Sequence, residues 1–272
     1  MLYSPILSFI RLVVLVPWIT IISFCQFVVL CFFKRFFFVF YKFLFFGIRK
    51  IFGIKLKVSG VQETKRVMFI SNHISYLDII ILGSVVNAVF VAKSEIKGWP
   101  IINKLCMLGK TIFIERNNRR SVKKQSVSIK EHMKNGFNVI LFPEGTSSDG
   151  SKVLSFKSSL FEVVDYEELR NYKLQPISIS YNKLDGLPLV KIHRPFLAWF
   201  GAMSLAPHVW QFLGLGTSEV NIRFHKSEKF SAFLNRKEAC RYCFERISEQ
   251  VIKDYQLLEV DNKIKLNEFK FL

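Results

Sequence analysis

The sequence predicts an α/β fold: a mixed, largely parallel sheet flanked by helices, preceded by an N-terminal membrane-anchoring helical segment. Beyond residue 50, short continuous apolar runs alternate with longer mixed segments, a pattern typical of strands buried on both faces and joined by helices. Before residue 50, residues 12–33 contain no Lys, Arg, His, Asp or Glu. The chain has no internal repeat and no linker rich in Pro, Gly or Ser, so residues 51–272 are expected to form one domain.

The elements of that domain are expected where the apolar pattern changes. Apolar runs predict strands at residues 67–70, 88–92, 111–114, 139–142, 175–181 and 219–225. The mixed segments predict helices, one beginning near Tyr76 and others at residues 95–108, 119–135 and 235–257. The helix at 119–135 is basic and expected on the surface, and the last helix is charged and amphipathic.

The N-terminal apolar run is long enough to cross a membrane, because about 20 apolar residues span the hydrocarbon core as a helix. A signal peptide has a shorter apolar region and a small-residue cleavage site, and a soluble helix is seldom apolar all round. Pro17 leaves a kinked or re-entrant helix open. Residues 36–48, interrupted by Lys42, suit a helix in the membrane interface. The basic residues after residue 33 favour a cytoplasmic position for the rest of the chain.

Composition narrows the class of protein further. Half of the 272 residues are apolar and 22% are charged, which excludes a disordered or collagen-like chain. The 39 Lys and Arg residues outnumber the 21 Asp and Glu residues, and this net charge of +18 predicts a polyanionic partner. Five cysteines without framework spacing argue against a disulfide-stapled secreted module.

The densest chemical signal is the segment Ser-Asn-His-Ile-Ser-Tyr-Leu-Asp at residues 71–78, directly after an expected strand. Loops at the carboxyl ends of strands carry the functional sites of α/β sheets. His73 and Asp78 can meet if His73 lies in the turn and Asp78 in the first helical turn, where the carboxylate would orient the imidazole as a general base. Ser75 and Asp78 also match a capping box, so a purely structural helix start is the alternative.

Two further loops follow expected strands in the same way. Residues 142–150, Phe-Pro-Glu-Gly-Thr-Ser-Ser-Asp-Gly, offer glycines, hydroxyls and backbone amides that can hold an anion or a polar headgroup. An ordinary polar turn has the same composition. Residues 109–116 bring Arg116 to the end of a strand, and a guanidinium matches phosphate geometry, although most single arginines face solvent.

These blocks, in this order, resemble the glycerolipid acyltransferase family, whose type member is the bacterial 1-acyl-sn-glycerol-3-phosphate acyltransferase. The first block, Asn-His followed after four residues by Asp, is matched by Asn72, His73 and Asp78. The Pro-Glu-Gly-Thr block is matched by residues 143–146. The two other blocks are matched by Gly109, Phe113, Ile114 and Arg116, and by Pro176. Four blocks in order over residues 55–225 make the resemblance specific.

The resemblance implies an O-acyltransferase of phospholipid biosynthesis that moves a fatty acyl group from acyl-CoA or acyl carrier protein to the hydroxyl of a lyso-lipid. His73 would be the general base and Asp78 its orienting partner. The residues implied in acceptor binding are Asn72, Arg116, Glu144, Gly145, Thr146 and Ser147. No metal and no bound cofactor are implied, because the thioester is a co-substrate. Residues 51–272 would be the acyltransferase domain and residues 1–50 the membrane-anchoring segment.

One position departs from the family pattern. Members that act on glycerol phosphates often have arginine after the Pro-Glu-Gly-Thr block, and here that residue is Ser147. Serine supplies a neutral hydrogen bond where arginine would supply a cation. The first expectation is acylation of 1-acyl-sn-glycerol-3-phosphate to phosphatidate, and the alternative acceptor is lyso-ornithine lipid or another lysophospholipid.

The positive charge is concentrated between Lys93 and Lys130, where ten basic residues accompany two glutamates. A basic surface beside an apolar anchor fits anionic membrane lipids, and it would also attract the phosphates of CoA or acyl carrier protein. The chain has no recognisable nucleic-acid module, so nucleic acid is not expected as a partner.

The lone Cys240-x-x-Cys243 pair lacks a second pair for zinc, and no Gly-x-Ser-x-Gly elbow or Walker loop is present. A membrane scaffold protein is the non-enzyme alternative, against which the intact block at residues 72–78 argues.

Overall fold

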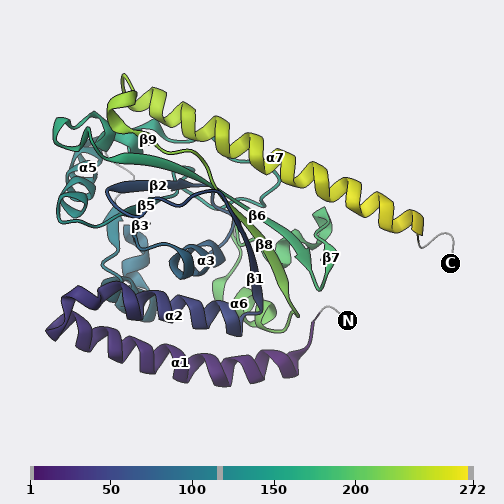
Figure 1. The fold of residues 1–272 in the computed structure, drawn as a ribbon. Coiled ribbons are helices and arrows are strands. Elements are labelled where there is room, and N and C mark those ends of the chain that lie inside the picture. The colour runs from purple at the N-terminus through teal and green to yellow at the C-terminus, as the bar shows by residue number, and fades with distance from the viewer. Residues whose placement is uncertain (1–2, 115–118, 269–272) are drawn as a thin grey trace.

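The computed structural model describes residues 3–114 and 119–268 of the chain (Figure 1). Their strands are β1 (Ile54–Ser59), β2 (Val67–Ser71), β3 (Val89–Lys93), β4 (Ile112–Ile114), β5 (Val139–Leu141), β6 (Lys173–Leu184), β7 (Leu187–Pro188), β8 (Ser218–Phe224) and β9 (Glu228–Lys229). The sheet order is β1-β8-β6-β2-β5-β3-β4, with β7 and β9 paired to β6. Neighbours along this order run parallel except β6 and β8. The predicted mixed, largely parallel sheet is confirmed.

Helices lie on both faces of the sheet. They are α1 (Pro5–Phe32), α2 (Phe37–Ile51), α3 (Leu77–Val85), α4 (Pro100–Leu108), α5 (Arg119–Lys134), α6 (Leu205–Leu213) and α7 (Arg236–Glu268). Helix α7 runs along one face, whereas α3 and then α2 cover the other, with α1 outside α2 (Figure 1). Short 3-10 turns occupy several of the connections.

The core follows from the continuous apolar runs. All five residues of β2 and all three of β5 are buried, as expected of central parallel strands covered on both sides. Phe69 of β2 and Ile81 of α3 have no exposed surface. Burial of each such side chain contributes about 1.5–3 kcal/mol, so the two strands that precede the polar loops are anchored firmly.

The expected elements are present with one interruption. Every predicted strand has its counterpart in β2, β3, β4, β5, β6 or β8. The helix expected over 95–108 is instead a 3-10 turn, Ser94–Gly98, followed by α4. Trp99 between them is extended, with φ −101° and ψ 100°, because the ring of Pro100 disfavours a helical conformation in the preceding residue. Pro100 then occupies the first helical turn, where its missing N–H is not needed.

Helix α1 lies along the domain over its whole length. Among the described helices, it is the one long and apolar enough to cross a membrane. Arg11, Trp18 and Gln26 donate hydrogen bonds from its beginning, middle and end to backbone carbonyl groups outside the helix. The acceptors are Leu215, Leu44 and Leu108, at 2.6, 3.1 and 3.3 Å respectively. The sequence-based segment of residues 1–50 is therefore packed against the rest of the chain, and its separation at residue 50 stays a prediction.

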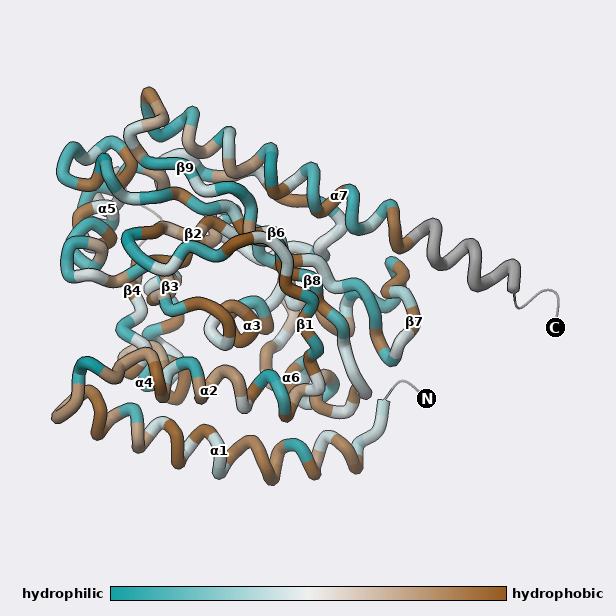
Figure 2. Tube along the Cα trace, viewed as in Figure 1, coloured by the Kyte–Doolittle hydropathy of each residue, from teal (hydrophilic) through white to brown (hydrophobic). Residues whose placement is uncertain are grey.

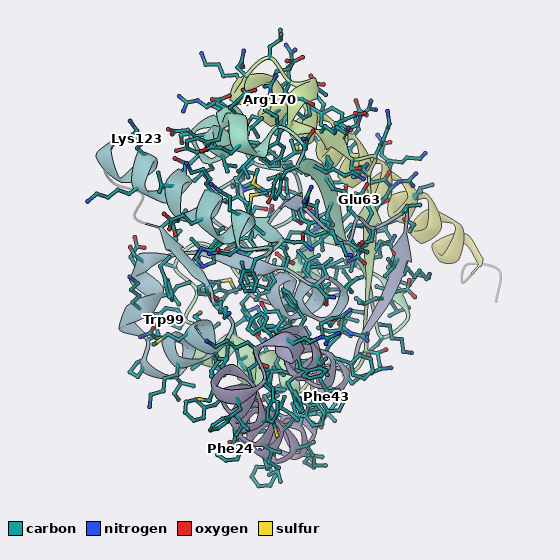
Figure 3. All side chains as sticks on the ribbon, turned by 60° about the vertical axis from the view of Figure 1, so that its left-hand side comes forward. Phe24, Phe43, Glu63, Trp99, Lys123 and Arg170 are labelled. Carbon is teal, nitrogen blue, oxygen red and sulfur yellow. The ribbon has the colours of Figure 1, made fainter. Side chains whose placement is uncertain are left out.

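The outer side of α1 is apolar and exposed (Figure 2). Phe24 is 67% exposed, and Phe32 at the end of α1 and Phe33 after it are exposed beside Lys34 and Arg35. In Figure 3, Phe24 and Phe43 lie at one end of the molecule and Lys123 of α5 lies toward the other. Lys123, one residue of the basic stretch expected beside the anchor, therefore lies away from this apolar face, and binding of anionic lipids by that stretch stays a prediction.

Candidate active site

His73 and Asp78 meet in the loop between β2 and α3. His73 Nδ1 lies 2.9 Å from Asp78 Oδ2, and the exposed fractions of the two side chains are 19% and 0%. Because a carboxylate only accepts hydrogen bonds, this contact places the proton on Nδ1 and leaves the lone pair on Nε2. The dyad therefore has the arrangement of a general base with an orienting carboxylate.

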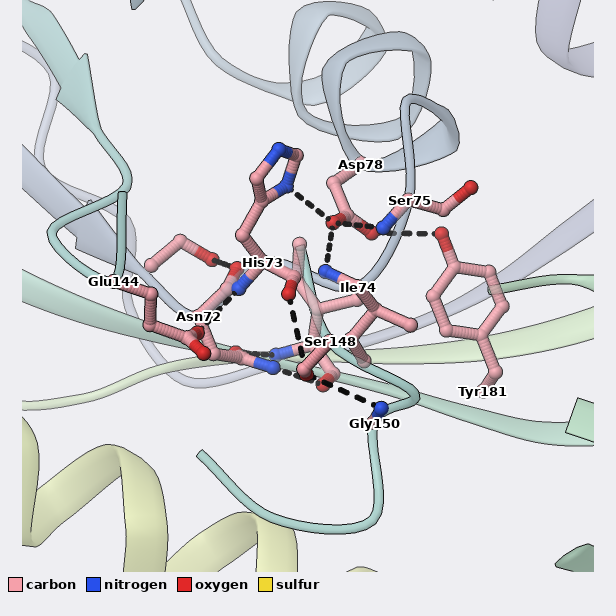
Figure 4. A network of polar contacts seen from close by, with 11 residues as sticks. Asn72, His73, Ile74, Ser75, Asp78, Glu144, Ser148, Gly150 and Tyr181 are labelled. Carbon is pink, nitrogen blue, oxygen red and sulfur yellow. Dashed lines mark hydrogen bonds and ion pairs between the residues drawn. The ribbon is translucent and has the colours of Figure 1, made fainter. Parts of the chain in front are cut away.

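The Asp78 carboxylate is held on both oxygens (Figure 4). Oδ2 also accepts the backbone N–H groups of Ile74 and Ser75, at 2.6 and 2.9 Å, and Oδ1 accepts the Tyr181 hydroxyl at 2.7 Å. The expected capping box is only half formed. Asp78 accepts the Ser75 N–H, but Ser75 Oγ makes no hydrogen bond within the described structure, and α3 begins after Tyr76. Asp78 is engaged with the imidazole as well as with the helix start.

Asn72 joins the histidine loop to the neighbouring strand β6. Its Nδ2 donates to the Ile179 carbonyl at 2.9 Å and its Oδ1 accepts the Ile179 N–H at 2.9 Å. The residue is 2% exposed. These contacts give Asn72 a role in positioning the loop, whereas its predicted contact with the acceptor stays a prediction.

Glu144 joins the same loop to the segment that follows β5. Its Oε1 accepts the His73 N–H at 2.7 Å, and its Oε2 accepts the Leu154 N–H at 2.9 Å. The residue is 4% exposed, and this burial raises the pKa of Glu144 to about 8, against the two N–H donors that favour the ionised form. The geometry favours a positioning role for Glu144, and direct binding of the acceptor stays a prediction.

The remaining predicted residues lie on the loop after β5 or outside the described structure. Gly145 has φ +77°, which favours glycine, and its N–H donates to the Phe142 carbonyl in a tight turn. This turn presents Thr146 exposed and Ser147 half-buried. Ser148 N–H donates to the His73 carbonyl at 3.0 Å, which ties the loop to the dyad. Arg116 lies outside the described residues.

Comparisons with known proteins identify the family. Residues 55–180 match the family model described as Acyltransferase. A lyso-ornithine lipid O-acyltransferase of Rhizobium meliloti is 37% identical over 204 residues, covering 73% of this chain and 70% of that protein. A protein of the same name from Brucella abortus is 31% identical over 74% of this chain and 77% of its own. The chain belongs to the acyltransferase family.

The fold of this acyltransferase also has a solved counterpart. The crystal structure of the 1-acyl-sn-glycerophosphate acyltransferase PlsC from Thermotoga maritima superposes with a TM-score of 0.64 at 18% identity, over 91% of this chain and 95% of that one. A 1-acyl-sn-glycerol-3-phosphate acyltransferase of Neisseria gonorrhoeae is 36% identical over 110 residues, 40% of this chain and 43% of that protein. The resemblance drawn from the four sequence blocks is confirmed.

The acyltransferase site includes aromatic groups around the base. The imidazole of His73 stacks on Phe142, with ring centroids 4.3 Å apart and an interplanar angle of 21°, and Phe142 in turn stacks on Phe90 of β3. The Phe142 ring, itself only 6% exposed, covers one face of the imidazole and excludes water from that side of the base.

Sequence reasoning missed Tyr181 as a residue of this acyltransferase site. Tyr181 lies in an expected strand. An apolar run does not indicate that its hydroxyl contacts the carboxylate of Asp78, which is 103 residues earlier in the chain. Cys240 and Cys243 are buried on α7, and burial raises the pKa of the Cys240 thiol to about 11, as in an unreactive core cysteine. In the described ranges, no three His, Cys, Asp or Glu side chains come together in a way that would hold a metal ion.

Proposed function

We propose that the chain transfers a fatty acyl group from an acyl thioester, acyl-CoA or acyl carrier protein, to the hydroxyl of a lyso-lipid. The observation that carries the proposal is the 2.9 Å contact between His73 Nδ1 and the buried Asp78 carboxylate, at the strand end where the blocks at residues 72–78 and 143–146 meet. This contact leaves Nε2 as the base that takes the hydroxyl proton of the acceptor.

The reaction balances without an acyl-enzyme. The hydroxyl oxygen attacks the thioester carbonyl as its proton passes to Nε2 of His73, and the resulting imidazolium is stabilised by Asp78. The carbon–sulfur bond then breaks, and the proton passes from the imidazolium to the departing thiolate. The products are the O-acylated lipid and a free thiol.

Lyso-ornithine lipid is the first acceptor to test. Two relatives that align over more than two thirds of both chains are lyso-ornithine lipid O-acyltransferases. Ser147 supports the same choice, because an ornithine headgroup contains no phosphate that would need a cation there. 1-Acyl-sn-glycerol-3-phosphate, the first expectation from the sequence, is the second candidate, supported by the shorter alignment to the Neisseria enzyme.

The protein is associated with the membrane, and we propose that α1 lies in one leaflet without crossing it. A helix that donates hydrogen bonds to the domain from Arg11, Trp18 and Gln26 cannot stand upright in the bilayer while the domain stays in water. Its exposed phenylalanines would enter the acyl chains, and Lys34 and Arg35 would meet anionic headgroups. The cytoplasmic position of the domain is part of this proposal.

The test is acyl transfer by the purified full chain to a panel of lyso-lipids. We expect turnover of lyso-ornithine lipid with labelled acyl thioester, and its loss in His73→Ala. His132→Ala is the matched control, because His132 lies on α5 and bonds to the Ser128 carbonyl at 2.9 Å. Turnover by His73→Ala would refute His73 as the base, whereas complementation of a deletion strain by a His73→Ala variant without turnover would favour the scaffold alternative. Turnover of 1-acyl-sn-glycerol-3-phosphate alone would select the second candidate.

A further inference from the structure

Tyr181 is a fully buried tyrosine whose hydroxyl donates to the carboxylate of the dyad. The contact to Asp78 Oδ1 is 2.7 Å long, and the two residues are 2% and 0% exposed (Figure 4). A buried hydroxyl requires a partner, and here that partner is the carboxylate that orients His73. Phenylalanine would fill the same volume, so packing alone does not account for the hydroxyl.

The pleat of β6 sets the direction of this side chain. Ser178 and Ser180 point to the α7 side of the sheet, where they bond to His225 and Asp254. Successive side chains of a strand alternate between faces, so Tyr181 points to the opposite side, toward α3. Two residues earlier, the backbone of Ile179 holds both amide atoms of Asn72. Strand β6 therefore binds the histidine loop at Asn72, before His73, and at the Asp78 carboxylate, after it.

The bonds on the carboxylate are unequal between its oxygens. Oδ2 accepts from His73 and from two backbone N–H groups, whereas Tyr181 is the donor that the described structure gives Oδ1. The χ2 torsion of aspartate is broad, so the carboxylate needs contacts on both oxygens to stay in one orientation. Without the hydroxyl, rotation would move Oδ2 out of line with the imidazole.

We propose that Tyr181 is a positioning residue for acyl transfer: its hydroxyl fixes the rotation of the Asp78 carboxylate and thereby the orientation of His73. The proposal rests on the proposed function, because it assigns Tyr181 a part in the same reaction.

Other titratable groups lie near this carboxylate or near Tyr181 itself. Tyr255 of α7 and Glu144 of the loop after β5 interact with Asp78, and Tyr76, just before α3, interacts with Tyr181. Burial keeps the pKa values of Tyr76 and Tyr255 well above neutral pH, and it raises the pKa of Glu144 to about 8. A comparison of wild type with Tyr181→Phe holds their contributions constant.

The experiment compares Tyr181→Phe with Tyr172→Phe. Tyr172 is the matched control because its hydroxyl also makes one bond, to the Met133 carbonyl at 3.0 Å, away from the dyad. In Tyr181→Phe we expect kcat to fall about tenfold with little change in KM, the size of effect that follows from losing one hydrogen bond to a charged group. Tyr172→Phe should keep the wild-type kcat even where it loses as much thermal stability.

The second readout needs no substrate. Proteins labelled with 15N-histidine are compared by NMR in detergent at one pH, and the His73 ring signals are assigned by their absence in His73→Ala. We expect these signals to shift in Tyr181→Phe and not in Tyr172→Phe, because the rotated carboxylate no longer accepts from Nδ1 in the same direction. Unshifted His73 signals together with unchanged kcat overturn the positioning role. Shifted His73 signals in a protein that acylates no lyso-lipid overturn the proposed function instead.

Discussion

Replacement of Glu144 by glutamine tests how the two loops of the site are held together. The carboxylate accepts the His73 N–H on one oxygen and the Leu154 N–H on the other, at 2.7 and 2.9 Å. Glu144→Gln keeps the shape of the side chain but replaces one acceptor by an NH2 group. One backbone N–H then loses its partner in a buried site, which costs about 1–3 kcal/mol.

The stability difference is expected to depend on pH. Burial raises the pKa of Glu144 from 4.5 to about 8, so between these values the folded protein holds a proton that the unfolded chain releases. Wild-type stability therefore falls as pH rises through this window, by on the order of 5 kcal/mol when the titration is complete. Glutamine has no proton to lose. The variant should be less stable than wild type at pH 5, and the gap should close or reverse by pH 8.5.

The assay is the midpoint of thermal unfolding in detergent at pH 5, 7 and 8.5, where 1 kcal/mol corresponds to about 2–4 °C for a domain of this size. Glu249→Gln on the exposed side of α7 is the control, and its midpoint should follow wild type at each pH. A difference between Glu144→Gln and wild type that stays constant from pH 5 to 8.5 would refute the reasoning, because it would leave only the pH-independent cost of the lost acceptor.

Further changes test the anchor and the acceptor site. Gly47→Leu should lower the midpoint of thermal unfolding by separating α1 from α2, because even a Cβ there would lie 2.0 Å from the Trp18 ring. Phe24→Lys should increase release of the protein from membranes by carbonate, whereas Val61→Lys, at a position 85% exposed on the domain, should not. Ser147→Arg should raise kcat/KM for 1-acyl-sn-glycerol-3-phosphate relative to lyso-ornithine lipid by about tenfold, measured with both acceptors.

The fold was predictable where burial is complete and less so at its margins. Five consecutive buried residues make β2 unmistakable. Strand β1, Ile54–Ser59, was not predicted, because the prediction followed continuous apolar runs, whereas this edge strand alternates apolar residues with lysines and pairs with β8 more than 160 residues later. The interruption at Trp99 was readable from Pro100, whose effect on the preceding residue is local.

The catalytic residues of the site could be predicted from the sequence, but the groups that hold them in place could not. The positions of His73 and Asp78 after a strand predicted their contact, which the structure has at 2.9 Å. Apart from the His73 imidazole, the partners of Asn72, Asp78 and Glu144 are backbone groups and one hydroxyl, which cannot be predicted from composition or spacing. Ile179, for example, binds Asn72 across 107 residues through N–H and C=O groups that every non-proline residue possesses.

Helices α1 and α2 are packed onto α3, the helix that carries Asp78, so the N-terminal segment is not a flexible tether to the domain. Trp18 of α1 lies over Gly47 of α2, and Phe45 of α2 lies against Gly83 of α3, close enough that a Cβ at either glycine would clash with the ring. Helix α3 carries Asp78 in its first turn. A continuous series of close contacts thus runs from the apolar surface of α1 to the carboxylate that orients His73. Because packed interiors deform little, the depth of α1 in the lipid would set the height of Nε2 above the bilayer. A lyso-lipid hydroxyl stays near the headgroup level, and a flexible linker would not hold the base at that level.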